Sequence, residues 1–394
     1  MFRLKMYPAK NGDSFLVNAD GTYILIDAGF ASTYQDFIAT DLELLAKEGG
    51  RLDLVVCTHI DADHIGGLLE FFSLNGTPDK RGIEVDAVWH NSLRSLPSTP
   101  TAQSDGLYDQ VVLEAIRRRG FQGVATSSPN PISARQGSSL AKLLRQYGYT
   151  WNSGDGTSCI SENDSPVSLP NNVGVQVIGP RTVRLEKLRD FWLREVRKLG
   201  YKGSSQPSDL LDDAYEMWCA TLPPPPIPQV TPISANSSRR LVDVYAPDAS
   251  IPNGSSIALL IFNENTRLLF LGDAWAEDVV DRLKALQPTA DPLIFDAIKV
   301  SHHGSLHNTS VELLSIADSP CFLISSDGSR HGHPDFEVLT EIVDRPAPFK
   351  RQLFFNYETA ASRKLESHIS RSDTAFSVHV AENNWIQVGG HNYD

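Results

Sequence analysis

The stretch THIDADHIGG, residues 58–67, places two histidines and two aspartates within six positions, directly after the apolar run LDLVVC. That run is rich in β-branched residues and suits a strand buried on both faces. The following residues, IGGLLEFF, have the spacing of a helix. Polar side chains at the point where a buried strand leaves its sheet are typical of functional sites in α/β proteins. The pattern therefore predicts a site on this loop.

The four polar side chains form two adjacent pairs. His59 and Asp61 lie two residues apart on an extended turn, so their side chains point the same way. Asp63 and His64 follow at the expected start of the helix. Imidazole and carboxylate are good ligands for Zn²⁺, and carboxylate also suits Mn²⁺. The alternative is that Asp63 caps the helix and the histidines are surface residues, but two such pairs on one short loop favour a binuclear metal site.

Two later segments have the same character. Asp273 follows the strand-like run RLLFLG, and His302 and His303 follow DAIKVS. Asp273 either caps the helix expected at AWAEDVVDRL or bridges two cations. Because all these groups stand at expected strand ends, we favour the bridging carboxylate.

The first third of the chain alternates strands and helices. Strand-like runs precede Gly29, the helical stretch TDLELLAK ends at Gly49, and IEVDAVWH is the next strand-like run after the 58–67 loop. This order of strand, helix and strand is typical of a layered α/β fold.

Two long stretches, 92–170 and 183–244, carry no motif that we assign. We expect them to be insertions in a single domain that spans 1–394. The second contains LPPPPIPQ, whose prolines favour an extended, linker-like conformation. Residues 346–394 are expected to form a strand-rich closing segment that ends in a hairpin at TAFSVHVAENNWIQVGG.

The composition is that of a globular protein with a substantial core. Hydrophobic residues make up 41% and charged residues 21% of the 394 residues, and the net charge is −13. Such a surface repels polyanions on average, so nucleic-acid contacts would have to be local. The four cysteines form no CxxC pair and are interpreted as reduced. We see no signal sequence and no apolar run long enough to cross a membrane, so a cytoplasmic protein without membrane contact is expected.

Several motifs together resemble a known family. THIDADHIGG resembles the His-x-[His/Asp]-x-Asp-His motif of the metallo-β-lactamase fold. GDS at residues 12–14, ILIDAG, LLFLGDA, KVSHHGS and HGHP are similar to motifs of the ComEC-like branch of that fold, in which a similar domain is part of a DNA-uptake protein. The motifs occur in the order of the family and span most of the chain.

The resemblance implies an αββα four-layer sandwich with large insertions and two divalent cations, Zn²⁺ or alternatively Mn²⁺, at one edge. The residues at the ligand positions are His59, Asp61, Asp63, His64, Asp273 and His302. The first pair on the loop would bind one cation and the second pair the other, with Asp273 between them. His302 would complete the second site, because relatives place this histidine two residues before the glycine, and His303 would face the substrate.

Two departures from the family pattern affect the first cation. Asp61 stands where relatives usually carry histidine, and a harder oxygen ligand weakens the preference for Zn²⁺ over Mn²⁺. No further histidine is found where the usual third ligand would lie, since VIGPRT contains none. His90, in VWHNS, either takes this role or is a polar residue at a strand end.

A pair of bound cations would lower the pKa of a water molecule, which could then attack a phosphorus or carbonyl centre. Asp63 is expected to orient this water, and His331 and His333 in SRHGHPD are candidates for the general acid. The alternative for SRHGHPD is a polar turn with Pro334 at the first position of a helix. The residues expected to contact substrate are His303, Ser305 and His90.

The resemblance favours a phosphodiesterase or nuclease with a nucleic-acid or nucleotide substrate. The alternatives are a hydrolase acting at a carbonyl centre, such as a lactonase, thioesterase or β-lactamase, and a metal-binding sensor whose insertions bind a protein partner. The basic runs 181–202 and 117–119 would contact a phosphate backbone, or they are solvated helix faces.

Overall fold

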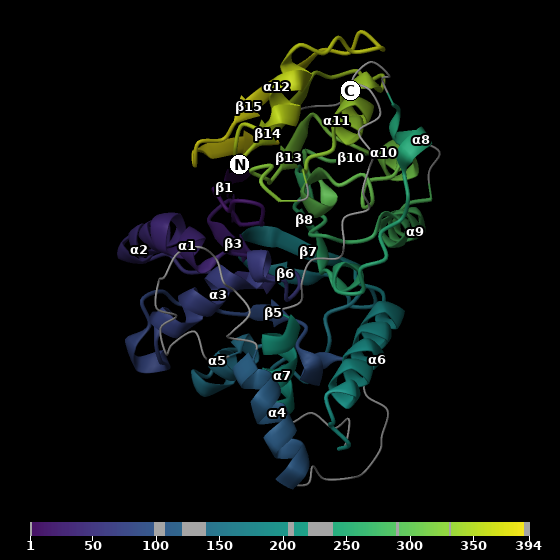
Figure 1. Ribbon diagram of the computed structural model, residues 1–394. Coiled ribbons are helices and arrows are strands. Elements are labelled where there is room, and N and C mark those ends of the chain that lie inside the picture. Colours follow the sequence, from purple (N-terminus) through teal and green to yellow (C-terminus); the bar gives the residue numbers. More distant parts are fainter. Residues whose placement is uncertain are drawn as a thin grey trace.

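The computed structural model describes residues 2–97, 107–119, 139–203, 209–219, 239–288, 291–330 and 332–389. Within these ranges two large sheets lie face to face (Figure 1). The strands of the first sheet, in spatial order, are β16 (Trp385–Val388), β1 (Phe2–Met6), β2 (Phe15–Ala19), β3 (Thr22–Ile26), β4 (Leu54–Cys57) and β5 (Val88–His90). β3, β4 and β5 run parallel, and the other neighbours are antiparallel.

The second sheet contains the later strands. In spatial order they are β15 (Phe376–Val380), β14 (Arg351–Phe355), β13 (Cys321–Ile324), β11 (Ala297–Lys299), β9 (Arg267–Phe270), β8 (Ala258–Phe262), β7 (Val173–Gly179) and β6 (Val167–Leu169). The strands from β15 to β9 run parallel, and those from β9 to β6 are antiparallel. A short parallel pair, β10 (Leu293–Ile294) and β12 (Ala317–Asp318), lies apart from it.

Helices form the outer layers. On the side of the first sheet they are α1 (Ala31–Thr33), α2 (Ala39–Lys47), α3 (Ala62–Asn75), α4 (Leu107–Arg119), α5 (Leu140–Gln146), α6 (Thr182–Lys198) and α7 (Asp209–Cys219). On the side of the second sheet they are α8 (Leu241–Val244), α9 (Ala276–Leu286), α10 (Val311–Ile316), α11 (Phe336–Asp344) and α12 (Ala360–Glu366). In Figure 1, α4, α5 and α7 lie toward the bottom of the view, and α10, α11 and α12 lie toward the top.

Three apolar cores separate four layers. Ile24 and Ile26 of β3 face the second sheet, whereas Leu25 between them packs among the helices that cover the first. In β9, Leu268 faces the first sheet and Leu269 packs among the outer helices of the second. Buried strands with two apolar faces require helices outside each sheet. The expected αββα sandwich is confirmed.

The long stretches without motifs contribute mainly helices. Residues 92–170 contain α4, α5 and β6, and residues 183–244 contain most of α6 with α7 and α8. Their role as insertions stays a prediction, and LPPPPIPQ lies outside the described residues. Among the helices that the structure describes, none is both long and apolar enough to cross a bilayer.

The expected hairpin at the end of the closing segment, 346–394, is wrong. β15 pairs in parallel with β14 in the second sheet, whereas β16 pairs antiparallel with β1 in the first. Both strands have the local pattern of a hairpin, but each extends the edge of a different sheet. The segment thereby ties the two sheets together.

Candidate metal centre

The 58–67 loop connects a buried strand to a helix. β4 ends at Cys57, and α3 begins at Ala62 with Asp61 as its N-cap. The Asp61 side chain makes no capping hydrogen bond, and Asp63 lies inside the first turn. The alternative interpretation, in which Asp63 caps the helix, is therefore wrong.

Two glycines let the neighbouring segments pack directly against this loop. A Cβ on Gly67 would lie 2.0 Å from the carbonyl oxygen of Ala28, and a Cβ on Gly12 would lie 2.0 Å from that of Asp63. A side chain at either position would push the backbones apart. The glycines of HIGG and of GDS thus bring the start of α3 against the end of β3 and the turn after β1.

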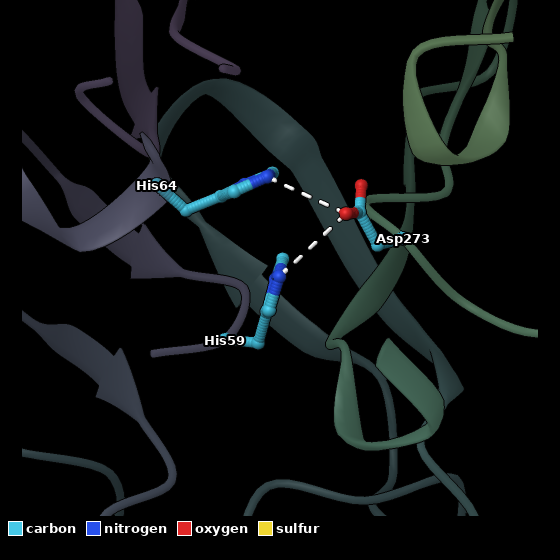
Figure 2. A group of neighbouring side chains, drawn as sticks. All are labelled: His59, His64 and Asp273. Carbon is cyan, nitrogen blue, oxygen red and sulfur yellow. Dashed lines mark ion pairs between the residues drawn. The ribbon is translucent and has the colours of Figure 1, made fainter. Parts of the chain in front are cut away.

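Three side chains from the two sheets converge on one point. Figure 2 shows His59 and His64 pointing toward Asp273, which follows β9. The Nε2 atoms of both histidines lie 3.6 Å from Asp273 Oδ2. Both nitrogens are buried, and neither has a hydrogen-bond partner among the described residues. The helix α9 has Trp275 as its N-cap, so the interpretation of Asp273 as a cap is wrong.

Two more histidine rings, from the HHG turn, lie close to the same carboxylate. His302 Nε2 lies 3.7 Å and His303 Nε2 lies 3.8 Å from Asp273 Oδ2. Both histidines have a positive φ, 46° and 57°, which non-glycine residues rarely adopt and which persists only where the surroundings enforce it. His303 is also grouped with Asp63 and His64, since their ligand atoms all lie within 4.8 Å of one another. No such group joins His302 to that pair among the described residues.

Asp61 belongs to the same assembly, because its Oδ2 lies 3.7 Å from His59 Nε2. We call these seven residues the Asp273 cluster: His59, Asp61, Asp63, His64, Asp273, His302 and His303. The structure thus brings together every residue predicted to bind metal, and it adds His303.

The histidines from the first sheet are oriented through their other ring nitrogen. His64 Nδ1 lies 2.8 Å from Asp27 Oδ2, which also accepts a 2.6 Å hydrogen bond from the hydroxyl of Thr58. His59 Nδ1 lies 3.1 Å from Oγ of Ser256. Histidines that bind metals usually have such a partner, which fixes the tautomer and the direction of the ring.

The histidines from the second sheet have equivalent partners. His302 Nδ1 lies 2.8 Å from the side-chain oxygen of Asn308, and His303 Nδ1 lies 2.8 Å from the carbonyl oxygen of Ser325. Asn308 also donates a 3.1 Å hydrogen bond to the backbone oxygen of Asp273. All four rings therefore turn Nε2 toward the same carboxylate.

The surrounding charges keep this carboxylate ionised. Burial alone would raise the pKa of Asp273, but the histidine rings around it, His302 foremost, lower the pKa well below its ordinary value. Burial lowers the pKa of His302 to about 4, so this ring is neutral at neutral pH. Burial also opposes charge on His64, yet Asp273 and Asp27 raise the pKa of His64 well above its ordinary value. The cluster thus favours positive charge next to Asp273.

The geometry and the donor set fit divalent cations. Ligand atoms about 2.1 Å from one tetrahedral cation lie roughly 3.4 Å from each other. The distances of 3.6 to 3.8 Å from Nε2 to Oδ2 are close to this value and too long for hydrogen bonds. Imidazole nitrogen and carboxylate oxygen suit Zn²⁺ and Mn²⁺.

Two of the predicted substrate contacts have other partners. His90 Nε2 lies 2.8 Å from Glu216 Oε1 of α7, and its ring stacks on Trp151. Ser305 is buried, and its Oγ accepts a 3.1 Å hydrogen bond from the backbone N–H of His307. Within the described residues, neither side chain has a hydrogen bond or ion pair with the Asp273 cluster. Their role in substrate binding stays a prediction.

The candidate general acids lie on the HGHP segment. His333 Nδ1 lies 3.2 Å from Asp335 Oδ2, and the ring centroids of His333 and His302 are 5.3 Å apart. His331 lies outside the described residues. Asp335 is the N-cap of α11, so Pro334 precedes the helix, and the alternative in which Pro334 holds the first helical position is wrong.

Several residues that orient the rings could not be assigned this role from the sequence. Asp27 lies in ILIDAG, which supported the family resemblance, and its φ of 52° marks an unusual backbone conformation. Ser256 and Asn308 belong to no motif, and their residue types are common in loops. Only the folded structure reveals their contacts.

Part of the chain matches a known protein family. Residues 7–144, about a third of the chain, match the family model described as the metallo-beta-lactamase superfamily. That range contains the 58–67 loop, and the four observed layers are those that the resemblance implied. The chain has the metallo-β-lactamase fold. No curated protein matches the chain.

Several solved structures resemble the chain over most of its length. One is Igni18, described as a novel metallo hydrolase from the archaeon Ignicoccus hospitalis, with 13% identity, coverage of 98% of this chain and 99% of that one, and a TM-score of 0.38. Another is the metallo-β-lactamase fold protein YhfI from Bacillus subtilis, with 8% identity, 98% and 100% coverage, and a TM-score of 0.37. A third is Zn²⁺-bound PqqB from Methylobacterium extorquens, with 11% identity, 95% and 87% coverage, and a TM-score of 0.34.

Members of the metallo-β-lactamase superfamily are metallo-hydrolases and typically bind divalent metals such as zinc. In this example of the fold, the matched range supplies the four ligand candidates of the 58–67 loop. Asp273, His302 and His303 come from beyond it, at strand ends of the second sheet. The candidate metal centre therefore lies where the two sheets meet.

Proposed function

We propose that the chain is a metal-dependent hydrolase that binds two divalent cations at the Asp273 cluster. The observation that carries the proposal is the convergence of the buried Nε2 atoms of His59 and His64 on Asp273 Oδ2. A buried polar atom without a partner costs about 1–3 kcal/mol. Two cations that share Asp273, one next to each histidine, would satisfy all three ligands.

The ligands divide into two sets that share one carboxylate. His59 and Asp61 are proposed to bind the first cation, and Asp63 and His64 the second, with Asp273 common to both. The first set has two carboxylates and one imidazole, which supports Mn²⁺ as the alternative to Zn²⁺.

We assign the remaining ligand of the second cation to His303. Its ligand atom lies within 4.8 Å of those of Asp63 and His64. The ring of His302 is the more exposed of the two, with 21% of its side chain accessible against 6% for His303. His302 is therefore the better candidate for contact with substrate, which reverses the preference drawn from the spacing of the motif.

The residues around the cluster have distinct proposed roles. When bound, two divalent cations would lower the pKa of water to near 7 and stabilise the charge that develops on the substrate. Asp63 orients the attacking water, while Asn11 Nδ2 holds Asp63 Oδ2 at 2.6 Å. His333 is proposed to donate a proton to the leaving group from Nε2, and its Nδ1 lies 3.2 Å from Asp335 Oδ2.

We infer that the substrate is a phosphodiester in a nucleotide or nucleic acid. The motifs similar to the ComEC-like branch support this class, and bound cations attract phosphate even on a chain with a net charge of −13. The basic runs are partly engaged within the fold. Arg184 of α6 bonds to Asp278 of α9 at 2.6 Å, and Arg117 of α4 bonds to Glu114 at 2.7 Å. This favours recognition at the cations over recognition along a basic groove.

The test is a metal and substrate survey of the full chain. Elemental analysis should find two divalent cations per chain. Hydrolysis with Zn²⁺ or Mn²⁺ is measured on cyclic nucleotides, single-stranded DNA and RNA, and on nitrocefin, a lactone and a thioester. Activity confined to the last three would replace the phosphodiester with a carbonyl substrate. Metal binding without any hydrolysis until a protein partner is added would favour a sensor.

The matched variants are Asp63→Ala and Asp36→Ala. Asp63 is a proposed ligand, whereas Asp36 is an exposed carboxylate on the surface. We expect Asp63→Ala to abolish hydrolysis while the protein stays folded, and Asp36→Ala to behave as the wild type. Unchanged hydrolysis in Asp63→Ala with metal still bound would overturn the mechanism.

A further inference from the structure

An ion pair is buried behind the Asp273 cluster, between Lys299 and Asp13. Lys299 ends β11 in the second sheet, and Asp13 precedes β2 in the first. The two side chains are only 1% and 2% exposed. Lysine is almost never fully buried without a partner. Because an apolar pair of similar volume is often at least as stable as a buried ion pair, stability alone is a weak reason for this one.

The lysine holds the backbone that leads into the shared carboxylate. Lys299 Nζ donates a 2.8 Å hydrogen bond to the carbonyl oxygen of Gly272, the residue before Asp273. It also lies 3.8 Å from Asp273 Oδ1, a buried oxygen without a hydrogen-bond partner among the described residues. The ammonium therefore fixes the backbone of Asp273 from behind, while Oδ2 faces the histidines.

The aspartate contacts the ring proposed to bind the second cation. Asp13 Oδ1 lies 3.3 Å from His303 Nδ1, and that nitrogen lies 2.8 Å from the carbonyl oxygen of Ser325. A carbonyl oxygen only accepts, so Nδ1 carries the hydrogen, and the lone pair of the neutral ring is on Nε2. This Nε2 is the atom that lies 3.8 Å from Asp273 Oδ2.

We propose that Asp13 and Lys299 are a positioning pair for the second cation. The carbonyl of Ser325 sets the tautomer of His303, Asp13 holds the tilt of the ring through its charge, and Lys299 fixes the backbone next to Asp273 while neutralising Asp13. The proposal rests on the proposed two-cation function and deepens it, because it states which residues prepare the second site without contacting the cation.

The charges behind and within the cluster agree with this role. The carboxylates are Asp13, Asp27, Asp61, Asp63 and Asp273. The ammonium of Lys299 offsets one of these negative charges, and divalent cations would offset others. A structural role, in which the pair only joins the two sheets, makes a different prediction: its loss would lower the free energy of unfolding and leave the affinity of the second cation unchanged.

The experiment uses Asp13→Asn in the full chain, with Co²⁺ alone as the probe. An amide accepts on one side only, so the variant turns an NH₂ group toward either Nδ1–H of His303 or the ammonium of Lys299. Stepwise Co²⁺ affinities and the visible d–d spectrum are measured. We expect the second Co²⁺ to bind about 10- to 100-fold more weakly and the first to change by less than about threefold. The spectrum at saturation of the first site should match that of Asp63→Ala.

The matched control is Asp318→Asn. Asp318 forms another buried pair, with Arg351 at 2.5 Å, and has no contact with the Asp273 cluster within the described residues. It should lower the melting temperature while both Co²⁺ affinities stay unchanged.

Two results separate the possible failures. If Asp13→Asn lowers the melting temperature but binds the second Co²⁺ as the wild type does, the pair is structural and the inference is overturned. If the wild type binds fewer than two Co²⁺ ions, the proposed function itself fails. Should Asp13→Asn not fold, Asp13→Glu keeps the charge but displaces the carboxylate by one methylene, and the same criteria apply to it.

Discussion

Two groups of buried histidine and carboxylate lie at neighbouring strand ends. They differ in whether the polar atoms that face each other are hydrogen-bonded. The Asp273 cluster begins just after β4. The second group, which we call the His90 network, begins at the end of β5 and contains His90, Arg94, Ser139, Asp212, Asp213 and Glu216. Cys57 of β4 pairs directly with His90 of the parallel strand β5, so both groups lie at the carboxyl ends of neighbouring strands of the first sheet.

In the His90 network the carboxylates already have partners. Glu216 accepts from His90 Nε2 at 2.8 Å and from the backbone N–H of Leu140 at 2.6 Å, at the start of α5. Asp212 bonds to Arg94 at 2.5 Å. In the Asp273 cluster, by contrast, two imidazole nitrogens face one carboxylate oxygen without a hydrogen bond. Both groups contain buried histidine and carboxylate, but His90 Nε2 bonds to the carboxylate that it faces, whereas His59 Nε2 and His64 Nε2 do not. This difference distinguishes the candidate metal centre from a structural network.

Asp273→Ala should have the largest effect, because it removes the ligand common to both cations. We expect the metal content to fall from two per chain to none and hydrolysis to fall by at least about 10³-fold, since most of the rate acceleration depends on the cations. Elemental analysis and steady-state kinetics measure both. Wild-type protein stripped by a chelator should lose activity in the same way and regain it with Zn²⁺ or Mn²⁺. Retention of two cations in Asp273→Ala would show that the cluster is not the metal centre.

Glu216→Ala should lower the stability of the fold rather than remove the metal. It leaves His90 and the N-terminal N–H groups of α5 buried without their acceptor, so we expect the free energy of unfolding to fall by about 3–5 kcal/mol. Glu216→Gln keeps an acceptor and should cost only about 1–2 kcal/mol. Urea unfolding measures the loss, and elemental analysis should still find two cations in the folded Gln variant. Loss of a cation there would make the His90 network part of the metal centre.

The ligands of the Asp273 cluster could be predicted because sequence and fold place them by simple rules. The 58–67 loop carries four of them next to one another, and the others each follow an apolar strand. Strands of the two sheets end at a common edge, so polar groups at those ends meet. A layered α/β fold followed from the same patterns, since runs such as LDLVVC require apolar neighbours on both faces. The four layers were implied by the family resemblance.

The partners of these groups could not be predicted, because they come from distant segments with common residue types. Ser256 lies 197 positions from His59, and nothing in its local sequence distinguishes it from other loop serines. His90 is a histidine after a strand, as the ligands are, and its actual partner Glu216 lies 126 positions away. The prediction of a final hairpin was wrong for the same reason, because the sequence pattern of a strand does not specify which sheet edge the strand joins.

The smallest effect on catalysis is expected from substitutions of exposed basic residues on α6. Here the comparison is between arginines that are paired within the fold and arginines that are exposed. Arg184 bonds to Asp278 within the fold, whereas Arg194 and Arg197 are exposed. If substrate is recognised at the cations, Arg194→Ala/Arg197→Ala should raise KM for single-stranded DNA by less than about threefold and leave its salt dependence unchanged. Lys47→Ala, at an exposed side chain of α2, is the matched control. A tenfold or greater rise in KM at low salt would instead make α6 a surface for a phosphate backbone, and the substrate a polymer that extends well beyond the metal centre.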